Sequence, residues 1–231
     1  MAYPEIADVE EFLINDNMIQ LPPADGKSVE IIRKPTIGQP PLNDKLPENI
    51  DGRVVIKVGD KITTDHIMPA GVHLKLRSNI PAYSKVVFEC FTDAGKPSFA
   101  ERAAAVRDNG LHGIIIGKDS YGQGSSREHA AICPMYLGIK VVAALAIERI
   151  HRANLVNFGI VPLLFANAED YEKISEGDTI KIDNAPGQLA VGAPVMGKLI
   201  TADGKEFAIE FKHQLSEEDI KIIKAGGRLN C

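Results

Sequence analysis

The sequence predicts an α/β fold with a central, largely parallel sheet, flanking helices and a C-terminal antiparallel meander. Between residues 53 and 165, short runs that are apolar throughout alternate with candidate helices, which is typical of parallel βαβ units buried on both faces. After residue 178, apolar residues recur at every second position between turns, which is typical of antiparallel strands. The 231 residues, of which 45% are apolar and 25% charged, suffice for one or two domains with a core.

Residues 1–52 are predicted to form an irregular connector or leader, and residues 53–231 the α/β domain. Positions 4–13 place apolar side chains at helical spacing among acidic ones, which favours a short amphipathic piece. Prolines interrupt residues 21–50 repeatedly and prevent regular hydrogen-bonded ladders there. A leader of this length is expected to wrap along a surface or to link the domain to a preceding one.

The elements of the α/β region follow from its apolar runs and helical periods. Candidate strands lie at residues 54–58, 86–88, 113–116, 141–145 and 160–165. Candidate helices lie at residues 99–109, 126–137, 148–157 and 169–176.

The C-terminal region has a different pattern. Residues 179–183, 197–201 and 207–211 show period-two character and are separated by Asn-Ala-Pro-Gly and Ala-Asp-Gly turns, which predicts an antiparallel meander. A final helix is expected over residues 216–225, because it opens with a Ser-x-x-Asp cap and is followed by Gly226 and Gly227.

Charge and cysteine content narrow the possible functions. The net charge of -5 gives no domain-wide positive field for nucleic acid or anionic lipid, so any anion must be bound locally. Cys90, Cys133 and Cys231 include no Cys-x-x-Cys pair and predict neither a disulfide framework nor a self-contained zinc or iron–sulfur site. The N-terminus does not resemble a signal peptide and no run of 18 apolar residues occurs, so a soluble, cytoplasmic protein without a membrane partner is expected.

The most informative run is residues 120–129, Ser-Tyr-Gly-Gln-Gly-Ser-Ser-Arg-Glu-His, which follows an apolar strand where open α/β sheets bind ligands. Ser125 and Glu128 fit a capping box, so the run also suits a plain helix start. Arg127 favours an anion site, because a cation in the first turn opposes the helix dipole and a guanidinium grips a carboxylate well. A serine hydroxyl in such a positive pocket would ionise more readily, which suits proton abstraction.

A second constellation lies at residues 59–77. Thr64 or Asp65 fits a plain N-cap, and His66 fits a surface histidine. However, the run follows a predicted strand and is followed by Lys75 and Arg77. These positions favour a site in which Arg77 binds a carboxylate and Asp65 orients, or forms an ion pair with, a catalytic group.

The helix predicted over residues 148–157 carries the third set of polar residues. Most of its polar positions are expected to form a solvated face. His151 and Asn154 are candidates for bracing the neighbouring loops, and direct catalysis by His151 or Arg149 is the less favoured interpretation.

Three motifs resemble the C-terminal swivel domain of the aconitase superfamily. They are Gly-Asp-x-x-Thr-Thr-Asp-His-Ile at 59–67, Tyr-Gly-x-Gly-Ser-Ser-Arg-Glu-His-Ala at 121–130 and Arg-Ile-His-x-x-Asn-Leu-x-x-x-Gly-Ile-x-Pro-Leu at 149–163. The resemblance is strong from about residue 53 to 165 and looser to the C-terminus. It implies a swivelling β/β/α domain and a hydro-lyase of the tricarboxylic acid cycle that interconverts citrate and isocitrate, with a [4Fe-4S] cluster as Lewis acid.

The resemblance also implies roles for individual residues. The catalytic positions are Ser125, Asp65 and His66, and the substrate-binding positions are Arg77, Ser126 and Arg127. Ser125 corresponds to the base that removes the substrate proton.

The family holds its cluster through three cysteines, two of them as Cys-x-x-Cys, in domains upstream of this one, and this sequence lacks that pair. The chain is therefore expected to bind no metal or cofactor itself and to be inactive alone. Its expected partners are a small tricarboxylate substrate and cluster-bearing aconitase domains.

Two alternatives stay open. The small subunit of an isopropylmalate or homoaconitate hydratase shares the Asp65 and Ser125–Ser126–Arg127 pattern, although such subunits begin close to their first strand whereas some fifty residues precede it here. A stand-alone carboxylate-binding module is the other alternative.

Overall fold

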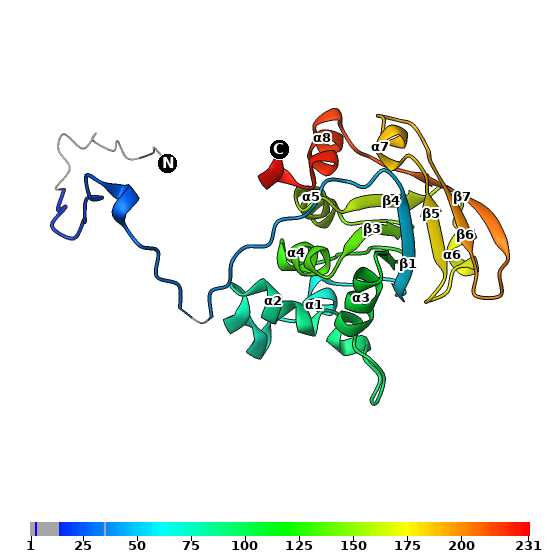
Figure 1. Ribbon diagram of the computed structural model, residues 1–231, viewed down its shortest axis with the longest axis horizontal. Helices are drawn as coiled ribbons and strands as arrows, with labels where there is room; N and C mark the ends of the chain where they lie inside the picture. Colours follow the sequence, from blue (N-terminus) through cyan, green and yellow to red (C-terminus); the bar gives the residue numbers. More distant parts are fainter. Residues whose placement is uncertain (1–2, 4–13, 35) are drawn as a thin grey trace. The chain divides into compact units, whose positions relative to one another are not determined.

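The computed structural model describes residues 3, 14–34 and 36–231, and the contacts within it divide the chain into two units, Met1–Arg33 and Lys34–Cys231 (Figure 1). The described part of the first unit holds a short 3-10 helix, η1 (Gly26–Ser28), in which the Asp25 side chain accepts a hydrogen bond from the Lys27 N–H. The amphipathic piece expected over residues 4–13 lies outside the described residues.

In the second unit, seven strands of the described residues close a barrel in the order β1-β2-β3-β4-β7-β6-β5. Strands β1 to β4 pair in parallel, whereas β5, β6 and β7 pair antiparallel to one another and to β1 and β4. The strands are β1 (Ile50–Lys57), β2 (His112–Ile116), β3 (Ile139–Ala144), β4 (Val161–Phe165), β5 (Thr179–Ile182), β6 (Val195–Ile200) and β7 (Glu206–Lys212).

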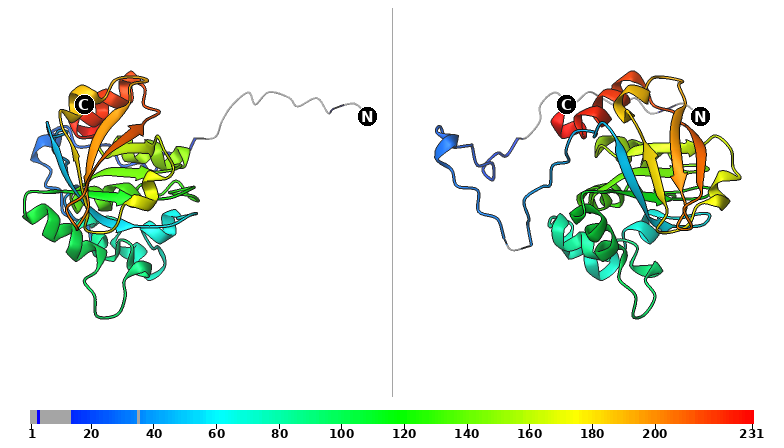
Figure 2. Two further views of the ribbon diagram at one scale, coloured as in Figure 1. Left: turned by 90° about the vertical axis from the view of Figure 1, so that its right-hand side faces the viewer. Right: turned by 45° about the vertical axis from the view of Figure 1, so that its right-hand side comes forward.

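Helices α1 to α5 lie on the side of the parallel strands away from β5–β7 (Figures 1 and 2). The α-helices are α1 (Thr64–Ile67), α2 (Ile80–Tyr83), α3 (Phe99–Asp108), α4 (His129–Tyr136), α5 (Arg149–Asn157), α6 (Asp170–Lys173), α7 (Ala185–Gln188) and α8 (Glu217–Ala225). The 3-10 helices of this unit are η2 (Gly71–Leu76), η3 (Ser84–Val86), η4 (Glu89–Phe91) and η5 (Arg228–Asn230). Within the described residues, no helix has the length and apolarity needed to cross a bilayer.

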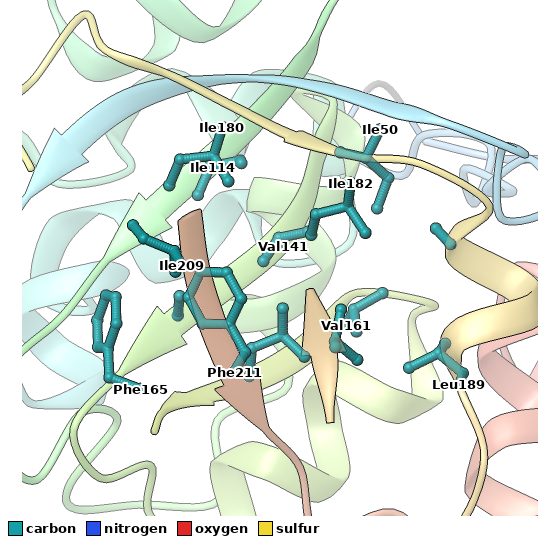
Figure 3. Close-up of a cluster of buried hydrophobic side chains, with 14 of the residues drawn as sticks. Ile50, Ile114, Val141, Val161, Phe165, Ile180, Ile182, Leu189, Ile209 and Phe211 are labelled. Atoms are coloured by element: carbon teal, nitrogen blue, oxygen red, sulfur yellow. The ribbon is translucent and has the colours of Figure 1, made fainter. Parts of the chain in front are cut away.

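The parallel strands carry runs of consecutive apolar residues, most clearly in β2, because the sheet separates two cores. Ile114 and Ile116 of β2 belong to the cluster that fills the barrel. Figure 3 shows Ile114 in this cluster together with Ile209 and Phe211 of β7. Ile115, between them in sequence, belongs to the cluster shared with the helices. Successive side chains of a strand point to opposite faces, so a strand covered on both faces has no polar position.

The structure confirms the predicted α/β fold, with its parallel sheet, flanking helices and antiparallel meander. The last helix also opens as expected, with a capping box between Ser216 and Asp219, and Gly226 follows it in the left-handed conformation at φ 91°. The closure of the sheet into a barrel was not predicted. Closure requires that β5 pairs with β1 and β7 with β4, and these long-range pairings have no local sequence signal.

Two expected elements were wrong in type or extent. Residues 86–88 form no strand: Phe88 has φ 54° and lies between η3 and η4, with its ring 5.0 Å from that of Phe99. A short apolar run cannot by itself distinguish a strand from a buried turn. The helix expected over residues 169–176 is only α6, after which Ile174 enters the barrel core.

Within the second unit, the segment before β1 is anchored to the barrel and its helices by side-chain and backbone bonds. Asn43 donates from Nδ2 to the Phe158 carbonyl at 3.0 Å and accepts a bond from Lys140 Nζ. The Leu46 N–H donates to the Lys224 carbonyl at 3.2 Å, and the Leu46 side chain is buried in the barrel core. Residues 43–46 are therefore fixed beside the barrel before the first strand begins.

Replacing Gly52, which pairs with β2 on one side and β5 on the other, is expected to destabilise the barrel. A β-carbon there would lie 2.2 Å from Ile114 Cδ1 and 2.8 Å from the Ile180 carbonyl oxygen, so the backbone would have to shift. We expect Gly52→Ala to lower the free energy of unfolding by about 1–3 kcal/mol in urea denaturation. Gly59→Ala is the control because nothing lies within 4 Å of its added carbon. Equal effects of the two substitutions would contradict this account.

Candidate active site

The loop between β2 and α4 is bonded to the segment that follows β1. The Gly122 N–H donates to the Ile62 carbonyl at 2.7 Å, and the Gln123 carbonyl accepts from the Thr64 N–H at 2.8 Å. Thr63 and Gln123 thereby form a parallel bridge beyond the ends of their strands. The loop that carries the residues 120–129 motif thus extends the sheet on this side.

The same loop is bonded on its other side to the segment that follows β3. The Tyr121 N–H donates to the Ala146 carbonyl and its carbonyl accepts from the Glu148 N–H, each at 2.9 Å. The His151 ring lies under the loop, with its centroid 5.3 Å from that of Tyr121. A β-carbon on Gly122, which has φ 84°, would lie 2.3 Å from His151 Cγ, so only glycine fits at this position.

His151 is an uncharged support for this loop. Its side chain is 1% exposed, and neither ring nitrogen has a hydrogen-bond partner among the described residues. Burial lowers the pKa of His151 to about 4, so the ring is neutral near pH 7. A ring that is closed to solvent and neutral packs against the loop without exchanging protons with a ligand.

Ser125 stands at the exposed end of the loop, next to a buried hydroxyl. Its Oγ lies 3.2 Å from Thr64 Oγ1, and Thr64 is 1% exposed. Gly124 precedes it with φ 109°, a conformation that side-chain-bearing residues rarely adopt. The turn at Gly124 therefore brings Ser125 to the start of α1.

Arg127 is held by one nitrogen of its guanidinium. Nη1 donates to Asp65 Oδ1 at 2.5 Å and to the Met68 carbonyl at 2.6 Å. The Arg127 side chain is 17% exposed, whereas that of Asp65 is 63% exposed. No described residue accepts a hydrogen bond from Nε or Nη2, so the opposite edge of the guanidinium keeps its donors for a ligand.

Four of the six predicted site residues line one open pocket of about 410 Å³. They are Arg77, Ser125, Ser126 and Arg127. The Arg77 guanidinium makes no hydrogen bond or ion pair with the residues that the structure describes. The lining is completed by Leu74, Ser78, Glu128 and His129.

Asp65 and His66 stand differently toward this pocket. Asp65 reaches it through its ion pair with Arg127. His66 does not line it: its N–H donates to the Thr63 hydroxyl and its Nδ1 accepts from the Thr63 N–H, each at 3.1 Å. These two bonds form the capping box of α1, and the His66 ring lies edge-on to Phe91 at 6.0 Å.

The structure corrects the predicted start of α4. The helix begins at His129, and its N-cap, Glu128, makes no capping bond. Ser125 and Glu128 therefore form no capping box, and Ser125 contacts Thr64 instead. Arg127 lies before the first turn of α4, and its charge is compensated by Asp65. The N-cap of α1 is likewise Thr63 and neither Thr64 nor Asp65.

A larger pocket of about 520 Å³ lies at the opposite ends of the strands, where β2 and β3 begin. Its half-buried cation, Lys140, bonds to Asn43, and the pKa of that lysine is lowered by burial. These contacts fasten the segment before β1. The smaller pocket is the candidate site because two serine hydroxyls and two arginine side chains line it.

The cysteines do not fit a [4Fe-4S] cluster. Cys133 is buried on α4, where burial raises its pKa to about 12, while Cys90 and Cys231 are exposed elsewhere. Across residues 3, 14–34 and 36–231, no three His, Cys, Asp or Glu side chains gather where they could hold a metal. An iron–sulfur cluster needs several thiolates at one place.

Sequence reasoning missed two contacts at the pocket, those of Thr64 and His129. Thr64 was considered only as a helix cap, yet its hydroxyl contacts Ser125. His129 belongs to the residues 120–129 motif but received no role, and its Nε2 lies 2.9 Å from the Arg77 carbonyl oxygen. The sequence signal for both contacts is weak: each residue is polar and lies beside predicted site residues.

Comparison with known families and proteins points in one direction. The aconitase C-terminal domain matches residues 71–168. A probable mitochondrial aconitate hydratase of Dictyostelium discoideum is 34% identical over 95% of this chain and 31% of its own length. The mitochondrial aconitate hydratase of Saccharomyces cerevisiae is 34% identical over 93% of this chain and 30% of its length.

One further relative and one solved structure are named dehydratases. The mitochondrial homocitrate dehydratase of S. cerevisiae is 33% identical over 77% of this chain and 25% of its own length. This chain thus spans less than a third of each of the three relatives. The crystal structure of 3-isopropylmalate dehydratase from Methanocaldococcus jannaschii superimposes with a TM-score of 0.55 at 24% identity, covering 79% of this chain and 91% of that one. This likeness supports the fold.

We expect the buried, neutral His151 to make stability depend on pH. Its pKa lies below the ordinary 6.5, so the unfolded chain binds a proton that the native chain refuses between pH 6.5 and about 4. Stability is therefore complete above pH 6.5 and falls as the pH drops through that window. Relative to His151→Phe, the wild-type chain should lose about 2 kcal/mol between pH 7.5 and pH 5 in urea denaturation. Parallel pH profiles of the two chains would disprove it.

Proposed function

Residues 71–168 of this chain belong to the aconitase C-terminal domain family, and from this premise we propose that the chain is the substrate-binding and base-supplying domain of an aconitate hydratase. Such an enzyme interconverts citrate and isocitrate by removing and re-adding water. The observation that carries the proposal is the pocket that gathers Ser125, Ser126, Arg127 and Arg77. Its hydro-lyase relatives support the same type of reaction.

In this proposal the chain works together with cluster-bearing aconitase domains. The connector before β1 joins it to those domains, and the pocket faces them. The [4Fe-4S] cluster is held there, since the described residues of this chain do not fit it. The chain itself contributes a base and groups that bind carboxylates.

Ser125 is the proposed base that removes a proton from the carbon next to a carboxylate. A serine acts as a base only when its alkoxide is stabilised, because an ordinary hydroxyl holds its proton tightly. The Thr64 hydroxyl, 3.2 Å away, is placed to donate a hydrogen bond to that alkoxide. The cationic side chain of Arg77, which lines the same pocket, favours the negative charge as well.

The substrate carboxylates bind to Arg127, Ser126 and Arg77. Arg127 presents Nε and Nη2 as the two donors of a fork that matches a carboxylate. Asp65 keeps the guanidinium in this orientation by binding Nη1. Arg77 lines the same pocket from the segment after η2, and it binds a second carboxylate of the substrate.

His66 has a separate place in the proposal. Its Nδ1 is engaged in the α1 cap, which leaves Nε2 on the exposed side of the ring. We place this nitrogen toward the partner domains, where it exchanges a proton with the substrate hydroxyl that is removed and re-added as water. This role depends on groups that the described residues do not contain.

The small subunit of an isopropylmalate-type dehydratase is the second candidate. Its fold is supported by the likeness to the M. jannaschii structure, of which 91% is covered. The identity of 24% carries the fold alone. A stand-alone carboxylate-binding module is the third candidate, and it differs from the other two in binding citrate tightly without a partner.

The names of the relatives bear on the cellular compartment. The aconitate hydratases compared above are named mitochondrial enzymes, which does not fit the cytoplasmic location expected from the sequence. The cytoplasmic location gains no support from them.

In the enzyme reconstituted with its cluster-bearing domains, Ser125→Ala is expected to lower kcat by a factor of at least ~10³, with KM changed less than about threefold. The reason is that a base acts in the transition state and contributes little to substrate binding. Steady-state kinetics with citrate and with isocitrate measure both constants. Ser175→Ala, an exposed serine outside the pocket, is the control and should leave both unchanged. Unchanged turnover in Ser125→Ala would remove Ser125 from the role of base.

The chain alone is expected to show no hydratase turnover and only weak binding of citrate. Arg127 is paired with Asp65, and the Glu128 carboxylate also lines the pocket, so the chain alone offers a tricarboxylate little net positive charge. Isothermal titration with citrate should therefore detect no heat at submillimolar concentrations. Tight binding that Arg77→Gln abolishes would instead favour the stand-alone carboxylate-binding module.

A further inference from the structure

Arg77 lies in a part of the fold with little support of its own. It follows η2, in which no residue is buried, and Val72 and Leu74 of that helix are 78% and 45% exposed. The Arg77 N–H bonds only locally, to the Leu74 carbonyl at 3.1 Å. The Gly38 N–H donates to the Ser78 carbonyl at 2.7 Å, which holds the chain one residue later. Leu76 packs against the helix-side core, so the contact that acts on Arg77 itself is the one made by its carbonyl.

His129 binds that carbonyl. Its Nε2 lies 2.9 Å from the Arg77 carbonyl oxygen, and a carbonyl only accepts, so Nε2 carries the proton. The bond joins residues 52 positions apart. It connects the segment after η2 to the first residue of α4.

The His129 ring is fixed before it makes this bond. Its side chain is 14% exposed and its ring packs on Tyr83, with centroids 5.3 Å apart and planes at 56°. Tyr83 is fully buried, and its hydroxyl donates to the Pro69 carbonyl at 2.9 Å. A ring held in one rotamer loses little further entropy when it donates, so the hydrogen bond is preorganised.

His129 links the two segments that line the pocket, residues 74–78 and residues 125–129. It lies two residues after Arg127 and four after Ser125, on the same loop-to-helix segment. Its bond therefore sets the backbone of Arg77 relative to the segment that carries the serines and Arg127. We infer that His129 is a positioning residue that holds Arg77 at the separation from Arg127 that a polycarboxylate ligand requires. The part of this inference that concerns the ligand rests on the proposed function. The tether, which is the hydrogen bond from His129 to the Arg77 carbonyl, does not depend on it.

Three variants separate the hydrogen bond from the packing. His129→Gln places an amide N–H near the position of Nε2 and keeps the donor. His129→Phe keeps a ring against Tyr83 but has no donor. His129→Asn has an amide that is too short to reach the Arg77 carbonyl, and it serves if the phenylalanine variant does not fold.

The first readout needs neither substrate nor partner. Limited trypsin digestion of the whole chain, followed by mass spectrometry, gives the rate of cleavage after Arg77. This rate should be similar in wild type and His129→Gln and at least fivefold higher in His129→Phe and His129→Asn. Cleavage after Arg228, an exposed arginine paired with Glu218, is the internal control and should not change. An unchanged rate after Arg77 in both donor-free variants would overturn the inference.

The second readout uses the enzyme reconstituted with cluster-bearing domains. His129→Phe and His129→Asn should raise KM about tenfold with kcat within about twofold of wild type, and His129→Gln should restore KM. A purely structural defect would lower kcat or the amount of folded enzyme without this split and without the rescue. Faster cleavage after Arg77 with an unchanged KM would support the tether and contradict the role of Arg77 in the proposed function. A fall in kcat alone, not rescued by glutamine, would overturn the positioning role.

Discussion

The candidate site depends on three neighbouring parallel strands that end at the same edge of the barrel. Because β1, β2 and β3 are adjacent and parallel, the segments that follow them leave the sheet side by side. The middle segment bonds to both of its neighbours, through Gly122 to Ile62 and through Tyr121 to Ala146. Strand order therefore places Ser125 beside Thr64 and Arg127 beside Asp65, because Thr64 and Asp65 lie on the segment after β1.

This arrangement also explains where the conformational constraints lie. The loop must turn sharply between two fixed segments, and it does so at Gly122 and Gly124, both with positive φ. The space under Gly122 is filled by the His151 ring, which leaves no room for a side chain above it. A rigid loop over a packed support is what a site needs if its hydroxyl and guanidinium are to stay in place without a ligand.

Much of this could be predicted from the sequence, because the relevant signals are local. The buried strands, the capping box at Ser216 and the motif around Ser125 each lie within a few residues. The closed barrel and the contact between His129 and Arg77 could not be predicted, since both join distant segments and depend on register. The error at the start of α4 has a related cause. Ser125 satisfies the local capping pattern, but the long-range contact with Thr64 and the ion pair of Arg127 with Asp65 outweigh it.

The ion pair between Asp65 and Arg127 need not compete with a bound carboxylate. A largely buried guanidinium is costly without an anionic partner, so Asp65 stabilises Arg127 while the pocket is empty. The pair uses one guanidinium nitrogen and leaves the opposite edge with its donors. Arg127 then contributes geometry more than net charge, because Asp65 has already neutralised it. The unpaired charge on this side of the site, among the residues that the structure describes, belongs to Arg77, which is held on an exposed segment through the backbone bond from His129. Arg127 thus orients a carboxylate and Arg77 attracts it. Of the two, only Arg77 depends on a tether that a single side chain, His129, provides.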